Sequence, residues 1–240
     1  LNTVTFLISA LFVAQLRIPA NAGRAEEEAP GGFRRFFADA REGLRFARHD
    51  RFVSRLLLVQ SLASLAVGAT GAMLVVLAEE HLRLPPAGVA WLIGAIGVGA
   101  LVGPLIPNAL AADYRDARWL FVPYVIRGIG DLLLAVVTAL PLALLILFVY
   151  GLNTSTGMVV FSSTVQGAVP DAVRGRVFAL LDVSWSAMRL LSLALGGLVV
   201  DRFGIRPLFW GGGALLAFAG LLGLALLGRD DFAQKPGPTP

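Results

Sequence analysis

Four charged side chains lie inside long apolar stretches of this sequence, and they form two pairs of opposite sign. Arg127 and Asp131 are four residues apart, and Asp182 and Arg189 are seven apart, so each pair shares roughly one face of a helix. A charge at the centre of a lipid bilayer costs on the order of 2.5–3.5 kcal/mol by insertion measurements, which makes such residues functional candidates. The alternative for each pair is a structural one, in which the acid neutralises a neighbouring base.

The composition explains why charges are exceptional here. Of the 240 residues, 57% are hydrophobic and only 15% are charged, against about 25% in soluble globular domains. A soluble domain of this length could not bury so much apolar surface in one core. The composition therefore excludes an ordinary soluble enzyme, a disordered chain and a nucleic-acid-binding module.

The sequence offers little for metal or cofactor chemistry. It has no cysteine, which excludes disulfides, thiolate nucleophiles and cysteine metal sites. Its two histidines, His49 and His81, are isolated from each other, which argues against a histidine metal site. We therefore expect no metal and no cofactor.

Apolar runs of membrane-spanning length predict an all-α polytopic membrane protein. The run 132–170 is uncharged for 39 residues, too long for one helix, and Pro141 is its expected break because proline disfavours helix before it. The short apolar run 1–16 is interpreted as the end of a truncated transmembrane helix, which brings the expected number of transmembrane helices to seven. The other six form a bundle over 56–228, with expected spans at 56–78, 87–112, 119–139, 142–165, 177–200 and 207–228.

Basic residues set the expected orientation, because cytoplasmic loops are enriched in Lys and Arg. If 17–55 is cytoplasmic and the spans alternate, 15 of the 20 basic residues lie in cytoplasmic segments and three lie in outer loops. The remaining two, Arg127 and Arg189, lie inside spans. This bias predicts a cytoplasmic C-terminus.

The segment 17–55 is expected to be a cytoplasmic linker containing an amphipathic helix at 33–48. Apolar residues recur there at a spacing of three to four, with arginines mostly on the other side. Such a helix either lies in the membrane interface or packs as a solvated helix on the ends of the bundle. The tail 229–240 ends in a proline-rich stretch and is expected to be disordered.

Glycines recur inside two spans, and we expect them to allow close helix packing. Gly97, Gly99 and Gly103 superficially have the spacing of a dinucleotide-binding loop, but that loop needs a strand and a helix N-terminus rather than an uncharged run. The same packing role is expected for the glycines of the last span. These are Gly211, Gly212, Gly213, Gly220 and Gly223.

The link between the last two spans carries the pattern GxxxDRxGxRxxL. Its acid and arginines can lock helix ends through charge-assisted hydrogen bonds and helix-terminus attraction. The residues that define it are Gly197, Asp201, Arg202, Gly204 and Arg206. This pattern resembles the G-x-x-x-D-R-x-G-R-R/K signature of the major facilitator superfamily, with Ile205 in place of the first closing basic residue.

Two further landmarks support the resemblance. A degenerate copy of the pattern lies one helical pair earlier, where Asp113 and Arg118 are kept and the glycine is lost. The stretch that contains Pro170, Arg174 and Arg176 resembles the VPxxxRGRV loop of drug- and siderophore-exporting members. Those members are related to enterobactin exporters and macrolide-efflux proteins.

The resemblance covers essentially the whole chain and implies its architecture. Superfamily members have twelve helices in two six-helix halves. Seven spans with a basic loop after the first fit helices six to twelve, which are the C-terminal six-helix half plus the end of the preceding helix. The partners implied are membrane lipids, a small-molecule substrate, protons and the missing N-terminal half of the same protein, with no nucleic acid.

The resemblance also implies a function, which is not that of an enzyme. It implies a secondary active transporter of the inner (plasma) membrane, an antiporter that exports a drug, macrolide or siderophore-like amphipathic molecule in exchange for protons by alternating access. An importer of the same fold is one alternative. The other is a non-transporting integral-membrane protein or enzyme.

The family architecture sorts the candidate residues. Helices seven, eight, ten and eleven line the central cavity, and helices nine and twelve are peripheral. A structural role is therefore favoured for Arg127 and Asp131 on helix nine, and a cavity or coupling role for Asp182 and Arg189 on helix eleven. Helix ten offers a polar run that either lines the cavity or makes interhelical hydrogen bonds, namely Asn153, Thr154, Ser155 and Thr156.

Overall fold

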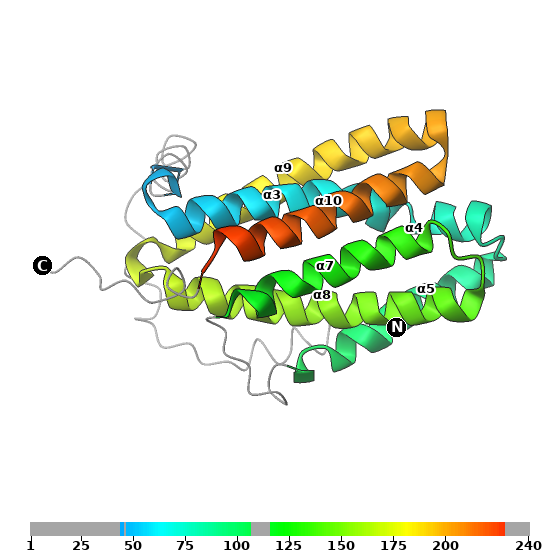
Figure 1. The fold of residues 1–240 in the computed structure, drawn as a ribbon, viewed down its shortest axis with the longest axis horizontal. Helices are drawn as coiled ribbons and strands as arrows, with labels where there is room; N and C mark the ends of the chain where they lie inside the picture. Colours follow the sequence, from blue (N-terminus) through cyan, green and yellow to red (C-terminus); the bar gives the residue numbers. More distant parts are fainter. Residues whose placement is uncertain (1–43, 46, 107–115, 229–240) are drawn as a thin grey trace, which may run out of the picture. The chain divides into compact units, whose positions relative to one another are not determined.

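A computed structural model describes residues 44–45, 47–106 and 116–228. Every regular element in these ranges is helical, which confirms the all-α prediction (Figure 1). The predictions for 1–16, 229–240 and nearly all of 33–48 lie outside the described residues. The described helices are α3 (Arg51–Ala72), α4 (Leu74–Val76), the π-helical turn η1 (Leu77–His81), α5 (Pro86–Val102), α7 (Ala117–Leu134), α8 (Leu140–Ala168), α9 (Asp171–Phe203) and α10 (Ile205–Leu226).

Four helices of the described ranges are long and apolar enough to cross a membrane. They are α3, α8, α10 and the Val173–Phe203 part of α9. Helix α5 is apolar but has 17 residues, and α7 has 18 residues and carries three charged side chains. All six expected spans within 56–228 thus correspond to helices, although their lengths and polarity differ.

Local chemistry explains where these helices begin and end. The Asp50 side chain accepts hydrogen bonds from the N–H groups of Phe52 and Val53 and so caps α3. Pro141 stands in the first turn of α8, where a missing N–H costs nothing, as the expected break requires. Gly204 joins α9 to α10 with φ = +82° and ψ = −179°, a conformation open to glycine and strained for other residues.

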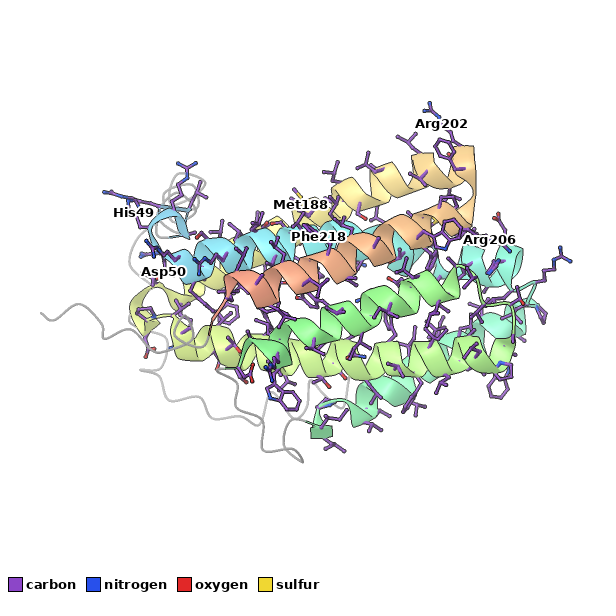
Figure 2. All side chains as sticks on the ribbon, viewed as in Figure 1. His49, Asp50, Met188, Arg202, Arg206 and Phe218 are labelled. Carbon is purple, nitrogen blue, oxygen red and sulfur yellow. The ribbon has the colours of Figure 1, made fainter. Side chains whose placement is uncertain are left out.

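The helices alternate in direction, so the turns gather at two ends of the bundle. Figure 2 labels Asp50 at one end and Arg202 and Arg206 at the other. We call these the Asp50 end and the Arg206 end. Within the bundle α3 packs on α9 and α10, α7 on α10 and α8, and α5 on α8. Each end has its own apolar core, built around Phe121 and Phe209 respectively.

Glycines bring helix pairs into backbone contact, as the sequence predicts, and two of these pairs illustrate it. A Cβ on Gly99 would overlap the Phe148 carbonyl of α8, and a Cβ on Gly213 of α10 would lie 2.6 Å from the Gly128 carbonyl oxygen of α7. Gly97 and Gly211 differ from these, because no atom lies within 4 Å of a Cβ built on either. The packing role thus holds for some of the expected glycines and fails for others.

Serine side chains join α3 to α9. The hydroxyls of Ser61 and Ser184 lie 2.8 Å apart, and Ser64 donates to the Trp185 carbonyl at 2.5 Å. The Ser192 hydroxyl accepts from the Ala69 N–H at 2.9 Å. These contacts fix which face of α9 is turned toward α3.

Candidate functional site

Helix α9 carries Asp182 and Arg189, the two charges that the sequence places inside its membrane span. Arg189 and Asp182 are both exposed and have no hydrogen-bond or ion-pair partner among the described residues. Arg189 follows Met188, which lies near the middle of α9 in Figure 2. The structure thus does not pair Arg189 with Asp182. Both are left available to groups beyond the described residues.

The polar run of helix α8 is divided among different surroundings. The Thr156 hydroxyl donates to the Gly103 carbonyl of α5 at 2.7 Å, which is an interhelical bond. Asn153 and Ser155 bond carbonyls of their own helix. Thr154 is exposed and has no hydrogen bond within the described part of the chain. Only Thr154 is therefore both exposed and unsatisfied in this run.

Two members of that run line a cavity of about 520 Å³ beside α7. Asn153 and Thr156 contribute from α8, and Trp119, Val122 and Pro123 contribute from α7. The cavity thus opens on helix α7 rather than on the face of α9 that carries Arg189.

The charges of helix α7 do not form the expected ion pair. Asp131 is only 2% exposed, and the Thr70 hydroxyl of α3 hydrogen-bonds its carboxyl group. The Arg127 guanidinium instead donates to the Tyr150 hydroxyl of α8 at 2.7 Å and lies 4.0 Å from the centre of that ring. Tyr150 thus holds the cation away from the acid, although the two residues share a helix face.

The turn between α9 and α10 is held by one of its predicted arginines. Arg206 Nε donates to His81 Nδ1 at 3.1 Å and so joins α10 to η1. Asp201 and Arg202 are exposed and make no hydrogen bond or ion pair in the described ranges. The locking expected for this motif is therefore made through Arg206 and the conformation of Gly204.

The turn between α8 and α9 is held by Arg174. Its guanidinium donates to the carbonyls of Gln166 and Val169, at 2.7 and 3.1 Å, and pairs with the Asp171 carboxylate. These carbonyls belong to the end of α8, where helical partners are missing, so the arginine caps that helix. Pro170 stands immediately before α9.

The earlier copy of the pattern lies largely outside the described residues. Asp113 is among the residues that the structure does not describe. Arg118 is exposed, and its N–H donates at 2.9 Å to Asp116, which caps α7. Groups of three or more potential metal ligands are absent from the described residues.

Comparison with known proteins identifies the family. A family model described as the Major Facilitator Superfamily matches residues 56–239. The chain belongs to the Major Facilitator Superfamily. This family, and the relatives reported below, are transporters and not enzymes.

Three relatives illustrate the range of its superfamily. The chain is 26% identical over 200 residues to the multidrug efflux pump Tap of Mycolicibacterium fortuitum, covering 81% of this chain and 48% of the pump. It is 22% identical over 237 residues to Tap of Mycobacterium tuberculosis, covering 98% of this chain and 55% of the pump. It is 26% identical over 136 residues to the putative niacin/nicotinamide transporter NiaP of Bacillus subtilis, covering 56% of this chain and 34% of that protein.

The chain spans about half the length of the efflux pumps it matches. No solved structure gives a significant match. The superfamily assignment therefore rests on sequence similarity together with the helical fold.

Sequence reasoning missed the partners of the α7 charges in this superfamily member. Tyr150 and Thr70 come from other helices, and a second polar contact joins Tyr124 of α7 to Gln60 of α3. A tyrosine and a threonine within apolar runs are unremarkable by themselves. Only the packing of α3, α7 and α8 shows that they meet these charges.

His81 makes the stability of the Arg206 end depend on pH. Burial, and next the Arg206 guanidinium, lower the pKa of His81 below its ordinary 6.5, and these effects outweigh an opposing interaction of the ring with the Val137 backbone, which acts as acceptor. Below pH 6.5 the unfolded chain therefore binds more protons than the folded one, so stability falls as the pH falls, by at most about 1.4 kcal/mol per pH unit. We expect thermal unfolding between pH 7.5 and 5 to show this loss, and His81→Gln to lack the His81 part of it. An identical pH profile in both proteins would contradict this role of His81.

Proposed function

We propose that this chain is the C-terminal part of a secondary active transporter that exports a small amphipathic molecule in exchange for protons. Membership of the superfamily and similarity to multidrug efflux pumps support this proposal. The substrate, a drug, macrolide or siderophore-like compound, binds near the membrane midplane between two six-helix halves, which rock to alternate access. The N-terminal half of the same protein supplies the rest of the cavity.

One observation carries the proposal beyond family membership. Arg189 lies near the middle of α9, exposed and without a partner in the described ranges. A guanidinium at that depth is not stable against lipid, so it faces a polar cavity or a partner group. Because its side chain is exposed although its backbone borders Gly68 of α3, the guanidinium is free to meet a substrate.

We infer the orientation from the distribution of basic residues. The Asp50 end, which carries most of the basic residues in the described ranges, faces the cytoplasm, and the Arg206 end faces outward. We propose that the protein lies in the inner (plasma) membrane with a cytoplasmic C-terminus. Cysteines introduced at Glu80 or Phe203, both exposed, then react with an impermeant thiol reagent in intact cells, and a cysteine at Arg118 does not.

A transport assay tests the proposal. The full natural protein that contains this sequence is reconstituted in vesicles, and a proton gradient is imposed across them. We expect the gradient to drive accumulation of at least one compound from a panel of fluorescent amphipathic drugs, and a protonophore to abolish it. Protein-free vesicles are the control. Absence of gradient-dependent movement for every compound contradicts proton-coupled export.

Similarity to a putative niacin/nicotinamide transporter favours a second candidate. In this candidate the same fold moves niacin or nicotinamide, and import is the alternative direction. Including both compounds in the vesicle assay, with the gradient imposed in either sense, separates the two candidates.

A further inference from the structure

Two unpartnered polar atoms lie one helical turn apart in the middle of the bundle. They are Arg127 Nε and Asp131 Oδ2, both buried and both without a hydrogen bond. Buried polar groups are almost always hydrogen-bonded, so two complementary ones left unpaired call for an explanation. Residues four apart on a helix can form an ion pair, yet the structure forms none between these two.

Each residue is instead held by another helix. Arg127 is drawn to the hydroxyl and ring face of Tyr150 on α8, at 2.7 Å and 4.0 Å. Asp131 is bonded by Thr70 of α3. The arginine therefore has two competing partners, Tyr150 and Asp131. In the structure it binds Tyr150.

The Thr70 hydroxyl suits both protonation states of the acid. Its oxygen lies 3.4 Å from the Val67 carbonyl oxygen and also bonds the Asp131 carboxyl. When Asp131 is ionised, Thr70 donates its single proton to the carboxylate. When Asp131 is protonated, Thr70 accepts from the acid and turns its own proton toward Val67.

Within the described part of the chain, the helices around this pair present no other charge that could replace Arg127. From α10, Gly212 lies against the Thr70 methyl group and Gly213 against the Gly128 carbonyl, so that helix presents backbone rather than charged groups. From α7 the titratable group nearest in sequence is Tyr124, which donates to Gln60 of α3; Arg118 lies near the start of the helix. The described parts of α3 and α8 present no charged group at this level, and Tyr150 is the titratable group of α8.

We propose that Asp131 is the carboxyl group that binds the coupling proton, and that Arg127 moves between Asp131 and Tyr150 as that proton leaves and enters. This assignment rests on the proposed proton-coupled transport. A proton from water adds to the Asp131 carboxylate and removes its charge, which frees Arg127 to bind Tyr150. When the proton leaves for water, the restored carboxylate draws Arg127 Nε back onto Oδ2.

Tyr150 connects the movement of Arg127 to helix α3. The residue is half-buried, and a Cβ built on Gly71 of α3 would lie 3.9 Å from its hydroxyl oxygen. Gly71 is exposed. Each shift of Arg127 thus changes the bonding of a hydroxyl that borders the exposed side of α3.

Infrared difference spectroscopy on the purified full protein tests the proton site without a transport measurement. We expect a carbonyl band of a protonated carboxyl group that appears on acidification and is lost in Asp131→Asn. The matched control is Asp182→Asn, which removes an exposed acid of α9 and keeps the band. Tyr150→Phe removes the competing hydroxyl, so Arg127 stays on the acid and the band appears only at lower pH.

Transport measurements on the same variants test whether the proton site drives accumulation of the substrate. We expect Asp131→Asn to lose proton-driven accumulation. A titrating band that survives Asp131→Asn, or full proton-driven transport by that variant, overturns the inference. Absence of proton-driven transport in the wild type overturns the proposed function instead, and the infrared transition still decides whether Asp131 titrates.

A second variant keeps the inference testable if the first one does not fold. If Asp131→Asn gives no folded protein, Thr70→Val removes the hydroxyl that serves both protonation states and keeps the side-chain size. We expect the pH at which the band appears to change in Thr70→Val. An unchanged infrared transition in that variant also overturns the inference.

Discussion

Gly213→Ala lowers the free energy of unfolding by about 3 kcal/mol, because α10 and α7 meet there through their backbones. The new Cβ lies 2.6 Å from the Gly128 carbonyl oxygen and 2.9 Å from the Leu132 nitrogen, and neither atom can move without shifting helix α7. Since α7 also carries Arg127 and Asp131, the same shift disturbs the polar contacts with α3 and α8. Reversible denaturation of the purified protein in mixed detergent micelles measures the loss.

Gly211→Ala is the matched control, on the same helix and only two residues away. No atom lies within 4 Å of its Cβ, so the alanine brings no overlap. Alanine in a helix interior is favoured over glycine by roughly 0.5–1 kcal/mol, and we expect a stabilisation of that size. Equal effects of the two substitutions would show that helix propensity, and not backbone contact, governs this part of α10.

The helices could be predicted because their causes are local. Apolar runs of spanning length, a proline that begins α8 and a glycine between α9 and α10 are all visible along the chain. The observed helix ends differ from the expected ones where tertiary contacts intervene. The expected span 119–139 ends as a helix at Leu134, and the expected span 56–78 is interrupted at Met73 before a π-helical turn.

The partners of the candidate residues could not be predicted, because they come from distant parts of the chain. Sequence spacing places Arg127 beside Asp131, yet the structure joins Arg127 to Tyr150, 23 residues away, and Asp131 to Thr70 of another helix. The same holds for Arg206, whose partner His81 is 125 residues away. Helical periodicity fixes which residues share a face, but helix packing decides what that face meets.

Arg189→Ala and Arg189→Lys both lower proton-driven export, whereas the amount of folded protein in the membrane stays near that of the wild type. The side chain of Arg189 is exposed and has no hydrogen-bond or ion-pair partner among the described residues, so its removal leaves no buried group of those residues unsatisfied. Lysine keeps the charge but lacks the planar fork that binds a carboxylate through two hydrogen bonds. A lost charge-assisted hydrogen bond costs about 1.5–3 kcal/mol, which corresponds to a loss of export of roughly tenfold or more.

The opposite result would indicate that Arg189 has a structural role and does not bind substrate. If the guanidinium only neutralises an acid outside the described residues, Ala reduces the folded protein in the membrane and Lys largely restores it. Leu190→Ala is the control, since its side chain is 68% exposed on the same helix and carries no charge. Export at the wild-type rate by well-folded Arg189→Ala would remove Arg189 from the substrate cavity. Because a guanidinium stays protonated at any physiological pH, a loss of export in both variants with unchanged pH dependence assigns Arg189 to substrate binding and leaves the proton to a carboxyl group.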